Sequence, residues 1–337
     1  MMEIAPLDPF DDAAFDAWHE AYLVAESACG VASPWQLEEL RVLMQEPSQR
    51  YLKLGWSGLV GGRTVTTGFL RAPLQDNLDR AELAVHTVPG ARGRGYGAAM
   101  LAHLEDAARE RGRTILVGES SWAYDDGPDG GDASGPRFAA AHGFELALGD
   151  VRRELRLPIA DGVLDGLLAE AAPYHRDFEL RSFAGPVPEE LLEGWARLTS
   201  SLMTEAPMGE LAVEDEAADP ALVRESERLV ELQGRRKYNT VAIDGAGELV
   251  GYTDLATTIH EPGRSYQWGT LVRGDARGHR LGLALKVANL RLLQGERPDI
   301  HLVTTYNAEV NAHMIGVNER LGFRPVARLG EFQKKLT

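Results

Sequence analysis

Hydrophobic and polar residues follow two different periods along the chain. Apolar residues recur every three or four positions over 8–28, 96–112 and 281–295, which is the spacing of a helix with an apolar face. Runs rich in β-branched and aromatic residues lie between such segments and predict strands. The predicted strands are 51–57, 63–72, 80–88 and 114–120 in the first half, and 240–244, 248–258, 266–272 and 300–306 in the second. Further helices are predicted over 188–202, 219–233 and 311–322, with a short helix and two strands around Gly143.

Two landmarks occur in both halves in the same order. The segment "ARGRGYG" (91–97) ends a predicted strand and begins a helix, and "ARGHRLG" (276–282) does so again 185 residues later. A Gly-Phe pair follows in each half, at Gly143 and at Gly322. Because matched order and spacing rarely arise by chance, we interpret the chain as a duplicated domain.

The duplication predicts a division of the chain into three parts. Residues 1–158 form the first domain, 159–177 form a connector with one short apolar helix, and 178–337 form the second domain. A chain of this length is long enough for each half to bury its own core.

Composition is that of a soluble globular protein, with 44% hydrophobic and 26% charged residues. The N-terminus lacks the features of a secretory signal and the apolar runs are too short to span a bilayer, so we expect a cytoplasmic protein. The single cysteine excludes an internal disulfide, and the nine histidines lack ligand spacing, so no metal site is expected.

The formal net charge of −16 argues against nucleic-acid binding, which depends on a basic surface. An acidic protein can attract cationic molecules, including amines. The same charge also has a simpler interpretation, which is solubility alone.

The repeated loop has the properties of an anion site. The first N–H groups of a helix are unsatisfied, and together with the helix dipole they attract anions. Glycines let an oxygen-rich ligand approach the backbone, and Arg92 and Arg94 add positive charge. The loop therefore suits a pyrophosphate, although a plain glycine-rich turn is the alternative. The Gly-Lys-Ser/Thr of a Walker loop is absent, and a dinucleotide fingerprint would open an all-parallel unit.

Arg92, Gly95 and Gly97 match the pattern Gln/Arg-x-x-Gly-x-Gly/Ala, and "VNERLGF" (317–323) follows the second copy. With these motifs the chain resembles the GNAT superfamily of N-acetyltransferases, once per half, and is similar to tandem members of the mycothiol synthase type. The resemblance implies an α+β fold with a mixed α/β sheet, in which two fused domains each have a mostly antiparallel twisted sheet flanked by helices. It implies acetyl-CoA as donor and a primary amine of a small molecule or peptide as acceptor. We expect a monomer or homodimer, with no nucleic-acid or membrane partner.

The resemblance assigns cofactor binding to both loops. In the first half the residues are Val88, Arg92, Gly93, Arg94, Gly95, Tyr96, Gly97 and Ala98, and in the second they are Val272, Arg277, Gly278, His279, Arg280, Leu281 and Gly282. A backbone N–H near Val88 or Val272 is expected to polarise the thioester carbonyl.

Each half keeps a different part of the family pattern. Arg280 stands where the motif has its first glycine, which restricts close approach of a pyrophosphate. Asn311 matches the family's helix-capping asparagine, which contacts the pantetheine arm, whereas the first half has Asp132 at that position.

The resemblance also implies direct attack of the amine on the thioester, which requires a proton acceptor. Glu82 occupies a strand position where family members place this base, and Glu119 and His86 are further candidates. An exposed strand residue is the simpler interpretation of Glu82. In the second half the equivalent position is Tyr266, and Asp254 on the neighbouring strand is the nearest carboxylate candidate.

The departing thiolate requires a proton, which the family often supplies from a tyrosine. Ala139 and Asn318 occupy that position in the two halves, so we expect Tyr306 to act as the acid, with Asn307 or Ser120 as alternatives. The missing tyrosines favour a rival hypothesis, a non-catalytic CoA-binding sensor or scaffold. A nucleotide-binding oxidoreductase is disfavoured because no early fingerprint is present.

Overall fold

The computed structural model of the protein describes residues 1–160, 162–205, 209–211, 213–214 and 216–336. The chain forms two compact units. Unit 1 contains Met1–Asp150, Gly209–Ala212 and Ala327–Thr337, and unit 2 contains Val151–Met208 and Val213–Val326. The expected domains were continuous in sequence, whereas unit 1 includes the final residues of the chain.

Unit 1 is built on a mixed sheet with the strand order β1-β2-β3-β4-β5-β12. The strands are β1 (Glu3–Pro6), β2 (Tyr51–Val60), β3 (Arg63–Pro73), β4 (Arg80–Thr87), β5 (Ile115–Ala123) and β12 (Arg324–Lys335). Neighbours are antiparallel except β4 and β5, which are parallel. The pairing of β12 with β5 runs from Ala327 to Lys335, which explains why the end of the chain belongs to this unit.

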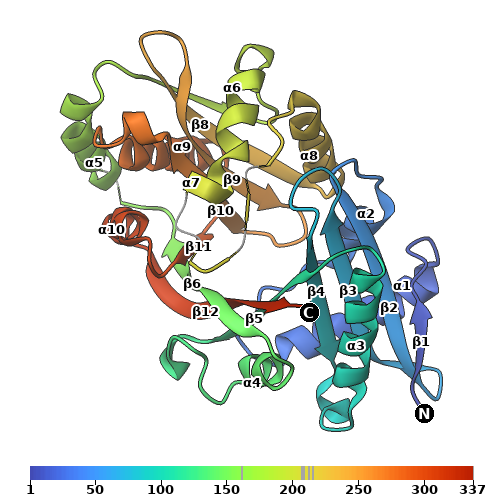
Figure 1. The fold of residues 1–337 in the computed structure, drawn as a ribbon. Helices are drawn as coiled ribbons and strands as arrows, with labels where there is room; N and C mark the ends of the chain where they lie inside the picture. The colour runs from blue at the N-terminus through green and yellow to red at the C-terminus, as the bar shows by residue number, and fades with distance from the viewer. Residues whose placement is uncertain (161, 206–208, 212, 215, 337) are drawn as a thin grey trace. The chain divides into compact units, whose positions relative to one another are not determined.

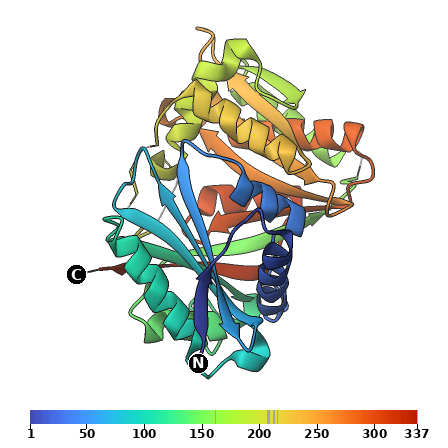
Figure 2. The same cartoon turned by 90° about the vertical axis from the view of Figure 1, so that its right-hand side faces the viewer.

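Helices cover both faces of the unit 1 sheet. The helices are α1 (Asp12–Ser27), α2 (Leu37–Gln45), α3 (Tyr96–Arg109) and α4 (Ser134–Ala141). Figure 2 shows α3 and α1 on opposite sides of the strands. Met100, Leu101, Leu104 and Ala108 of α3 are buried, as the periodicity predicts, and pack on β3 and β4. Phe69, on the alternate face of β3, packs against α1 and α2.

The parallel pair β4 and β5 stays together for only three residues. Arg80 pairs with Ile115, Ala81 with Leu116 and Glu82 with Val117, and the pairing ends there. Beyond Glu82, the described strands therefore provide no partner for the backbone of β4 on the β5 side.

Unit 2 repeats this plan with the strand order β6-β11-β10-β9-β8-β7. Its strands are the second part of β6 (Glu145–Arg156), then β7 (Glu179–Ala184), β8 (Arg235–Ile243), β9 (Leu249–Thr258), β10 (Arg264–Val272) and β11 (Leu302–Ala308). β10 and β11 are parallel and separate after Gln267 and Thr305, as β4 and β5 do after Glu82 and Val117, so Gln267 rather than the expected Tyr266 is the counterpart of Glu82.

The helices of unit 2 also lie on both faces of its sheet. They are α5 (Val163–Ala171), α6 (Glu189–Ser200), α7 (Leu202–Glu205), α8 (Pro220–Leu232), α9 (Leu281–Glu296) and α10 (Ala312–Leu321). Residues of α9 are buried on nearly all sides because α5, from the connector, packs along it (Figure 1). Leu164 and Ala171 of α5 join the same apolar core as Leu283 and Val287 of α9.

Some elements differ from the sequence prediction. The two strands expected after Gly143 form one continuous strand, β6, in which the alternation of buried and accessible residues is interrupted at Gly149 and Asp150 without ending the strand. Strands β1 and β7 and helix α2 are additional, and at four to nine residues each is too short to show a clear period.

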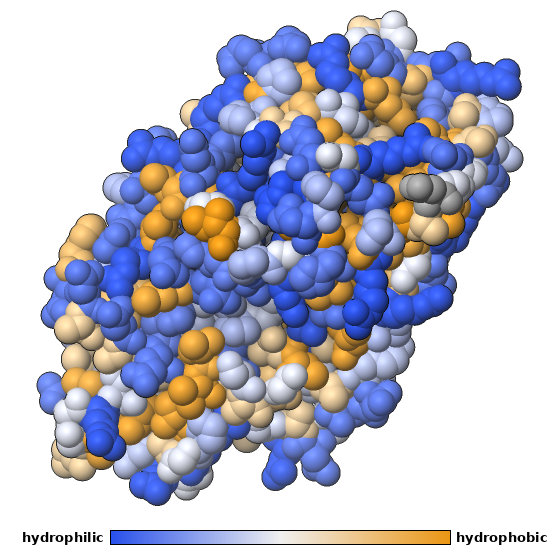
Figure 3. Space-filling model, turned by 180° about the vertical axis from the view of Figure 1, so that it is seen from behind, coloured by the Kyte–Doolittle hydropathy of each residue, from blue (hydrophilic) through white to orange (hydrophobic). Residues whose placement is uncertain are grey.

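No helix within the described residues is long and apolar enough to cross a membrane. On the face drawn in Figure 3, hydrophilic residues predominate and the hydrophobic ones form separate small groups.

Candidate active site

The first-half loop connects β4 to α3 through the short 3-10 helix η1 (Pro89–Ala91). Gly93 and Gly95 have φ angles of 75° and 81°, in the left-handed region that favours glycine. Nothing lies within 4 Å of a Cβ built at either position, so their backbone conformation, rather than crowding, requires glycine. Gly97 differs, because a Cβ there would lie 3.0 Å from Oγ1 of Thr87. The helix start therefore packs closely on the end of β4.

The Arg92 side chain holds this loop in place through two hydrogen bonds to backbone carbonyls. Its Nε donates to the Thr87 carbonyl at 3.0 Å, and an Nη donates to the Ala25 carbonyl of α1 at 3.1 Å. Arg94 is exposed and has no polar partner among the described residues. Gly95, the N-cap of α3, provides no side chain to bind the first N–H groups of the helix. The loop thus presents a free cation and free backbone donors to solvent.

The second-half loop follows the same backbone path. Nε of Arg277 donates to the Val272 carbonyl at 3.1 Å, which repeats the contact of Arg92 with Thr87. Arg280 is the N-cap of α9 with a φ of 53°, the left-handed conformation that Gly95 has in the first half. A side chain has therefore replaced glycine without changing the turn, at a cost of about 1–2 kcal/mol for left-handed backbone in a non-glycine residue.

The side chains of this second loop are bound by the chain itself. Arg280 forms an ion pair with Glu170 at the end of α5, and its guanidinium lies 4.0 Å from the centre of the Tyr174 ring. Nδ1 of His279 lies 2.9 Å from the Tyr174 carbonyl oxygen. Arg277 binds the Glu205 carboxylate at 2.6 Å. The cationic side chains of this loop are therefore neutralised or covered within unit 2.

Three glutamates meet on one face of the unit 1 sheet, beside the point where β4 and β5 separate. Glu82 forms an ion pair with Arg71, its partner on β3, with nitrogen–oxygen distances of 2.8 and 2.6 Å. Glu119 lies two residues beyond Val117 on β5 and has no ion-pair partner among the described residues. Glu331 of β12 is directly opposite Glu119. Side chains at paired and alternate positions share a face of the sheet, so the three carboxylates lie together.

The surroundings raise the pKa of two of these carboxyls. Desolvation and the negative charge of Glu82 raise the pKa of Glu119 to about 7, against a smaller lowering by Arg71. Desolvation and the charge of Glu119 raise the pKa of Glu331 to about 8. Glu119 is an exposed residue, so solvent weakens its desolvation, while the neighbouring like charges act in the same upward direction.

The resemblance implies a polarising backbone N–H near Val88. The N–H of Val88 itself donates to the Val65 carbonyl of β3 at 3.1 Å, so a neighbouring N–H of β4 has to serve this role. Alternate residues of a strand direct their N–H groups to opposite neighbours. Val85 and Thr87 therefore direct theirs away from β3, toward the side that β5 has left. These two N–H groups are the donors available at the opening.

The structure also places Tyr306 and His86, two other residues that the sequence predicts for catalysis. Tyr306 is half-buried on β11 of unit 2, whereas Glu82 belongs to unit 1. His86 lies 3.3 Å from the Glu26 carboxylate. Desolvation acts to raise the pKa of Glu26, but the hydrogen bond with His86 and the nearby charge of Arg92 outweigh it and hold that pKa below its ordinary value.

The asparagine signature has a structural role in the second half. The Asn311 side chain accepts from the N–H of Met314 at 3.2 Å and caps α10. Asp132 is exposed, and the equivalent helix α4 has no side-chain cap.

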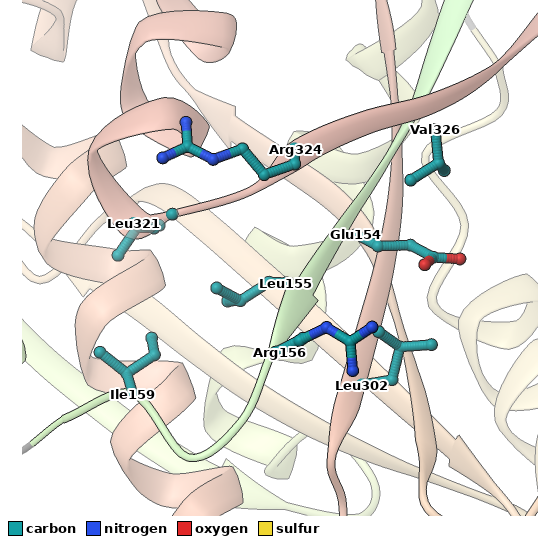
Figure 4. A pocket seen from close by; sticks show the side chains of 9 residues that line it. Glu154, Leu155, Arg156, Ile159, Leu302, Leu321, Arg324 and Val326 are labelled. Carbon is teal, nitrogen blue, oxygen red and sulfur yellow. The ribbon is translucent and has the colours of Figure 1, made fainter. Parts of the chain in front are cut away.

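A separate pocket of about 380 Å³ lies in unit 2 (Figure 4). Apolar side chains such as Leu155, Ile159 and Leu302 line it, together with Arg156 and Arg324. None of the predicted loop or catalytic residues contributes to it, so its size does not mark it as the reacting site.

Sequence reasoning missed three residues of these two sites. Arg71 follows from the hairpin register opposite Glu82, which a strand alignment could have suggested. Glu170 and Glu331 meet their partners only through tertiary packing, and no local pattern indicates either contact.

Comparison with known proteins places the geometry in context. Residues 13–120 match the model of the Acetyltransferase (GNAT) family. Mycothiol acetyltransferase from Geodermatophilus obscurus is 28% identical over 298 residues, which are 81% of this chain and 82% of that protein. A solved tandem GNAT protein from the clavulanic acid biosynthesis pathway, without AcCoA, has a TM-score of 0.76 and 28% identity, covering 99% of this chain and 98% of that one.

A more distant structure shares the fold. The GCN5-related N-acetyltransferase from Sphaerobacter thermophilus has a TM-score of 0.68 at 14% identity, covering 99% of this chain and 95% of that one. The predicted fold class, with its mixed sheets flanked by helices in a tandem arrangement, is confirmed by these likenesses.

Proposed function

Because the chain is an acyl-CoA-dependent N-acyltransferase of the tandem GNAT type, we propose that its first-half loop binds acetyl-CoA and that unit 1 acetylates a primary amine. The observation that carries this proposal is the contrast between the loops. In the described part of the chain, no side chain pairs with Arg94 or caps the start of α3, whereas Arg277 and Arg280 already bind carboxylates in the second half. The family match over 13–120 also contains the first loop and not the second.

Residues of unit 1 suit a CoA diphosphate. Arg94 can pair with a phosphate, and the backbone N–H groups at the start of α3 can donate to its oxygens. Arg92 stays bound to the carbonyls of Thr87 and Ala25 and so keeps the loop in position. Bound here, acetyl-CoA would supply the acetyl thioester.

The proton acceptor that this geometry favours is Glu119 rather than Glu82. Glu82 is held by Arg71, whereas Glu119 has no such partner and has a pKa raised to about 7, near the working range of a general base. As the amine nitrogen bonds to the acetyl carbon and the carbon–sulfur bond breaks, Glu119 takes the proton from nitrogen. The N–H of Val85 or Thr87 stabilises charge on the carbonyl oxygen.

The departing thiolate takes a proton to complete the transfer. Tyr306 stays a prediction for this role, and solvent can also serve because a thiol is acidic enough to leave as thiolate.

Small-molecule amines are the acceptor class that the relatives support. One relative is a mycothiol acetyltransferase and one neighbour comes from clavulanic acid biosynthesis, and both names refer to small-molecule metabolism. The identity of the amine, and a peptide amine as the alternative, are decided by a substrate panel.

The test combines calorimetry with thiol release. We expect one acetyl-CoA to bind per chain, and free CoA thiol to appear faster when the right amine is added from a panel of spermidine, glucosamine, lysine and a lysine-containing peptide. Binding without amine-dependent thiol release from any panel member or wider amine library supports the sensor or scaffold alternative. Absence of any acetyl-CoA binding rejects both.

A further inference from the structure

Glu119 and Glu331 lie opposite each other on two neighbouring strands that are far apart in the sequence. Glu119 is on β5 of the first half and Glu331 on β12, the last strand of the second half, and both belong to unit 1. Directly opposed residues of antiparallel strands have Cβ atoms about 4.5–5.5 Å apart on the same face. Two ionised carboxylates so placed repel, and a proton kept by one of them removes the repulsion.

The cations around this pair do not neutralise it. Arg71 of β3 is bound to Glu82 and stacks over Tyr51 of β2. The Arg80 guanidinium comes no closer than 3.9 Å to Glu331, beyond hydrogen-bond distance. The further groups that act on the pair are acidic: Glu82 of β4, Asp150 of β6 and Glu26 of α1, the last bound to His86.

Arg80 gives an independent sign that a ligand completes this site. Its side chain is 9% exposed, and its Nε is buried without a hydrogen-bond partner among the residues that the structure describes. A buried guanidinium N–H is costly to leave unpaired. Because Arg80 points toward Glu331 on the carboxylate face, an oxygen atom of a bound acceptor molecule can satisfy it.

We propose that Glu119 and Glu331 share one proton at neutral pH, with Glu119 ionised as the catalytic base and Glu331 protonated as its positioning residue. Protonated Glu331 donates a hydrogen bond to Glu119, which orients the carboxylate while leaving its charge in place. The direction of proton transfer rests on the function proposed above. When the amine nitrogen bonds to carbon, its proton passes to Glu119 and leaves the pair doubly protonated until solvent removes one proton.

In this arrangement, catalysis in the first half depends on β12, the last strand of the chain. β12 supplies Glu331 to the site formed by β4 and β5, so the first half without its last strand lacks the residue that holds the shared proton. The pKa values agree with this assignment. Burial and neighbouring charge raise the pKa of Glu331 to about 8 and that of Glu119 to about 7, so Glu119 loses its proton first as pH rises.

The pair can be tested without any substrate. In the full-length protein with carbon-13 at the glutamate carboxyls, NMR titration from pH 4 to 10 should show Glu331 keeping its proton to about pH 8. Glu119→Gln removes the neighbouring charge and should lower the pKa of Glu331 by about one unit or more. Glu105→Gln, which removes a carboxylate bound to Lys334, is the matched control and should leave Glu331 unchanged. Titration of Glu331 below pH 6, or no response to Glu119→Gln, overturns the pair.

Kinetics then test the positioning role with an amine from the panel. Glu331→Gln keeps a neutral hydrogen-bond donor, so kcat should stay within about threefold of the original, whereas Glu331→Ala should lose about tenfold or more. The fall in kcat/KM above about pH 8, expected when Glu331 ionises, should disappear in Glu331→Gln. Equal losses in both variants, or an alkaline fall that persists in Glu331→Gln, overturn the role. If no amine reacts, the proposed function fails while the NMR titration still decides whether the pair exists.

Discussion

Arg280 at the start of α9 forms an ion pair with Glu170 at the end of α5, and Glu170 also binds Arg320 of α10. One carboxylate thus holds two cations where the first-half loop leaves Arg94 free. In effect the connector supplies the negative charge that a phosphate would bring. The two copies of the loop share a backbone conformation, but only in the second copy does a carboxylate from the connector bind the arginine at the start of the helix.

Removing this internal carboxylate should open the second loop. In Glu170→Ala/Tyr174→Ala, the Arg280 side chain loses its ion pair and its ring contact, and we expect calorimetry to report a second, weaker acetyl-CoA site. Exposed ion pairs contribute about 0–1 kcal/mol each, so the fold should survive. Glu179→Ala, which removes an exposed acid elsewhere in unit 2, is the control and should keep one site. Two sites in the unaltered protein would show that the second loop is open already.

A bulky residue at the start of α3 should stop cofactor binding in the first half. Gly95→Arg places a side chain at the mouth of the loop and forces left-handed backbone on a non-glycine residue, so CoA-dependent turnover should be lost. Gly245→Arg, at an open turn of unit 2, should keep full activity. If Gly95→Arg remains active while substitution of Gly282 abolishes turnover, the second half holds the working site.

Glu82 and its ion pair with Arg71 should set the pKa of the base Glu119, and Glu82 should not itself be the base. Glu82→Gln removes a negative charge and releases Arg71, and both changes lower the pKa of Glu119. We therefore expect the acid limb of the kcat/KM profile to move from about pH 7 to a lower value while activity persists. Glu119→Gln should instead lose about 100-fold or more, the usual contribution of a general base. The reverse pattern would make Glu82 the base.

Stability should fall as pH rises through the neutral range. In the folded protein the pKa values of Glu119 and Glu331 are about 7 and about 8, above the ordinary value of 4.5. Between pH 4.5 and about 8 the folded state therefore binds more protons than the unfolded state. Their stabilising contribution is therefore complete below about pH 4.5 and is lost as pH rises toward 8. Thermal unfolding of the protein at pH 6 and pH 9 should show this loss, and Glu331→Gln should lose less Tm over the same interval. A larger Tm loss in the variant would contradict the raised pKa.

Much of the fold could be predicted from sequence because its signals are local. The apolar period of α3, the glycine turn between β2 and β3, and the loop at 91–97 each depend on residues close together in the chain. The repeat of these signals after 185 residues was sufficient to indicate two similar halves. β1 and α2 escaped prediction because short elements carry too few positions to define a period.

The sequence by itself determined the repeated plan, the two loops and the candidate base on β4 or β5. Tertiary structure decided what each of these residues touches. Glu170 reaches Arg280 because α5 buries its apolar side against α9, and Glu331 reaches Glu119 because β12 pairs with β5. The physical reason is that charge and burial act through space, so a carboxylate more than 200 residues away can set the protonation of Glu119 where its own neighbours in sequence do not.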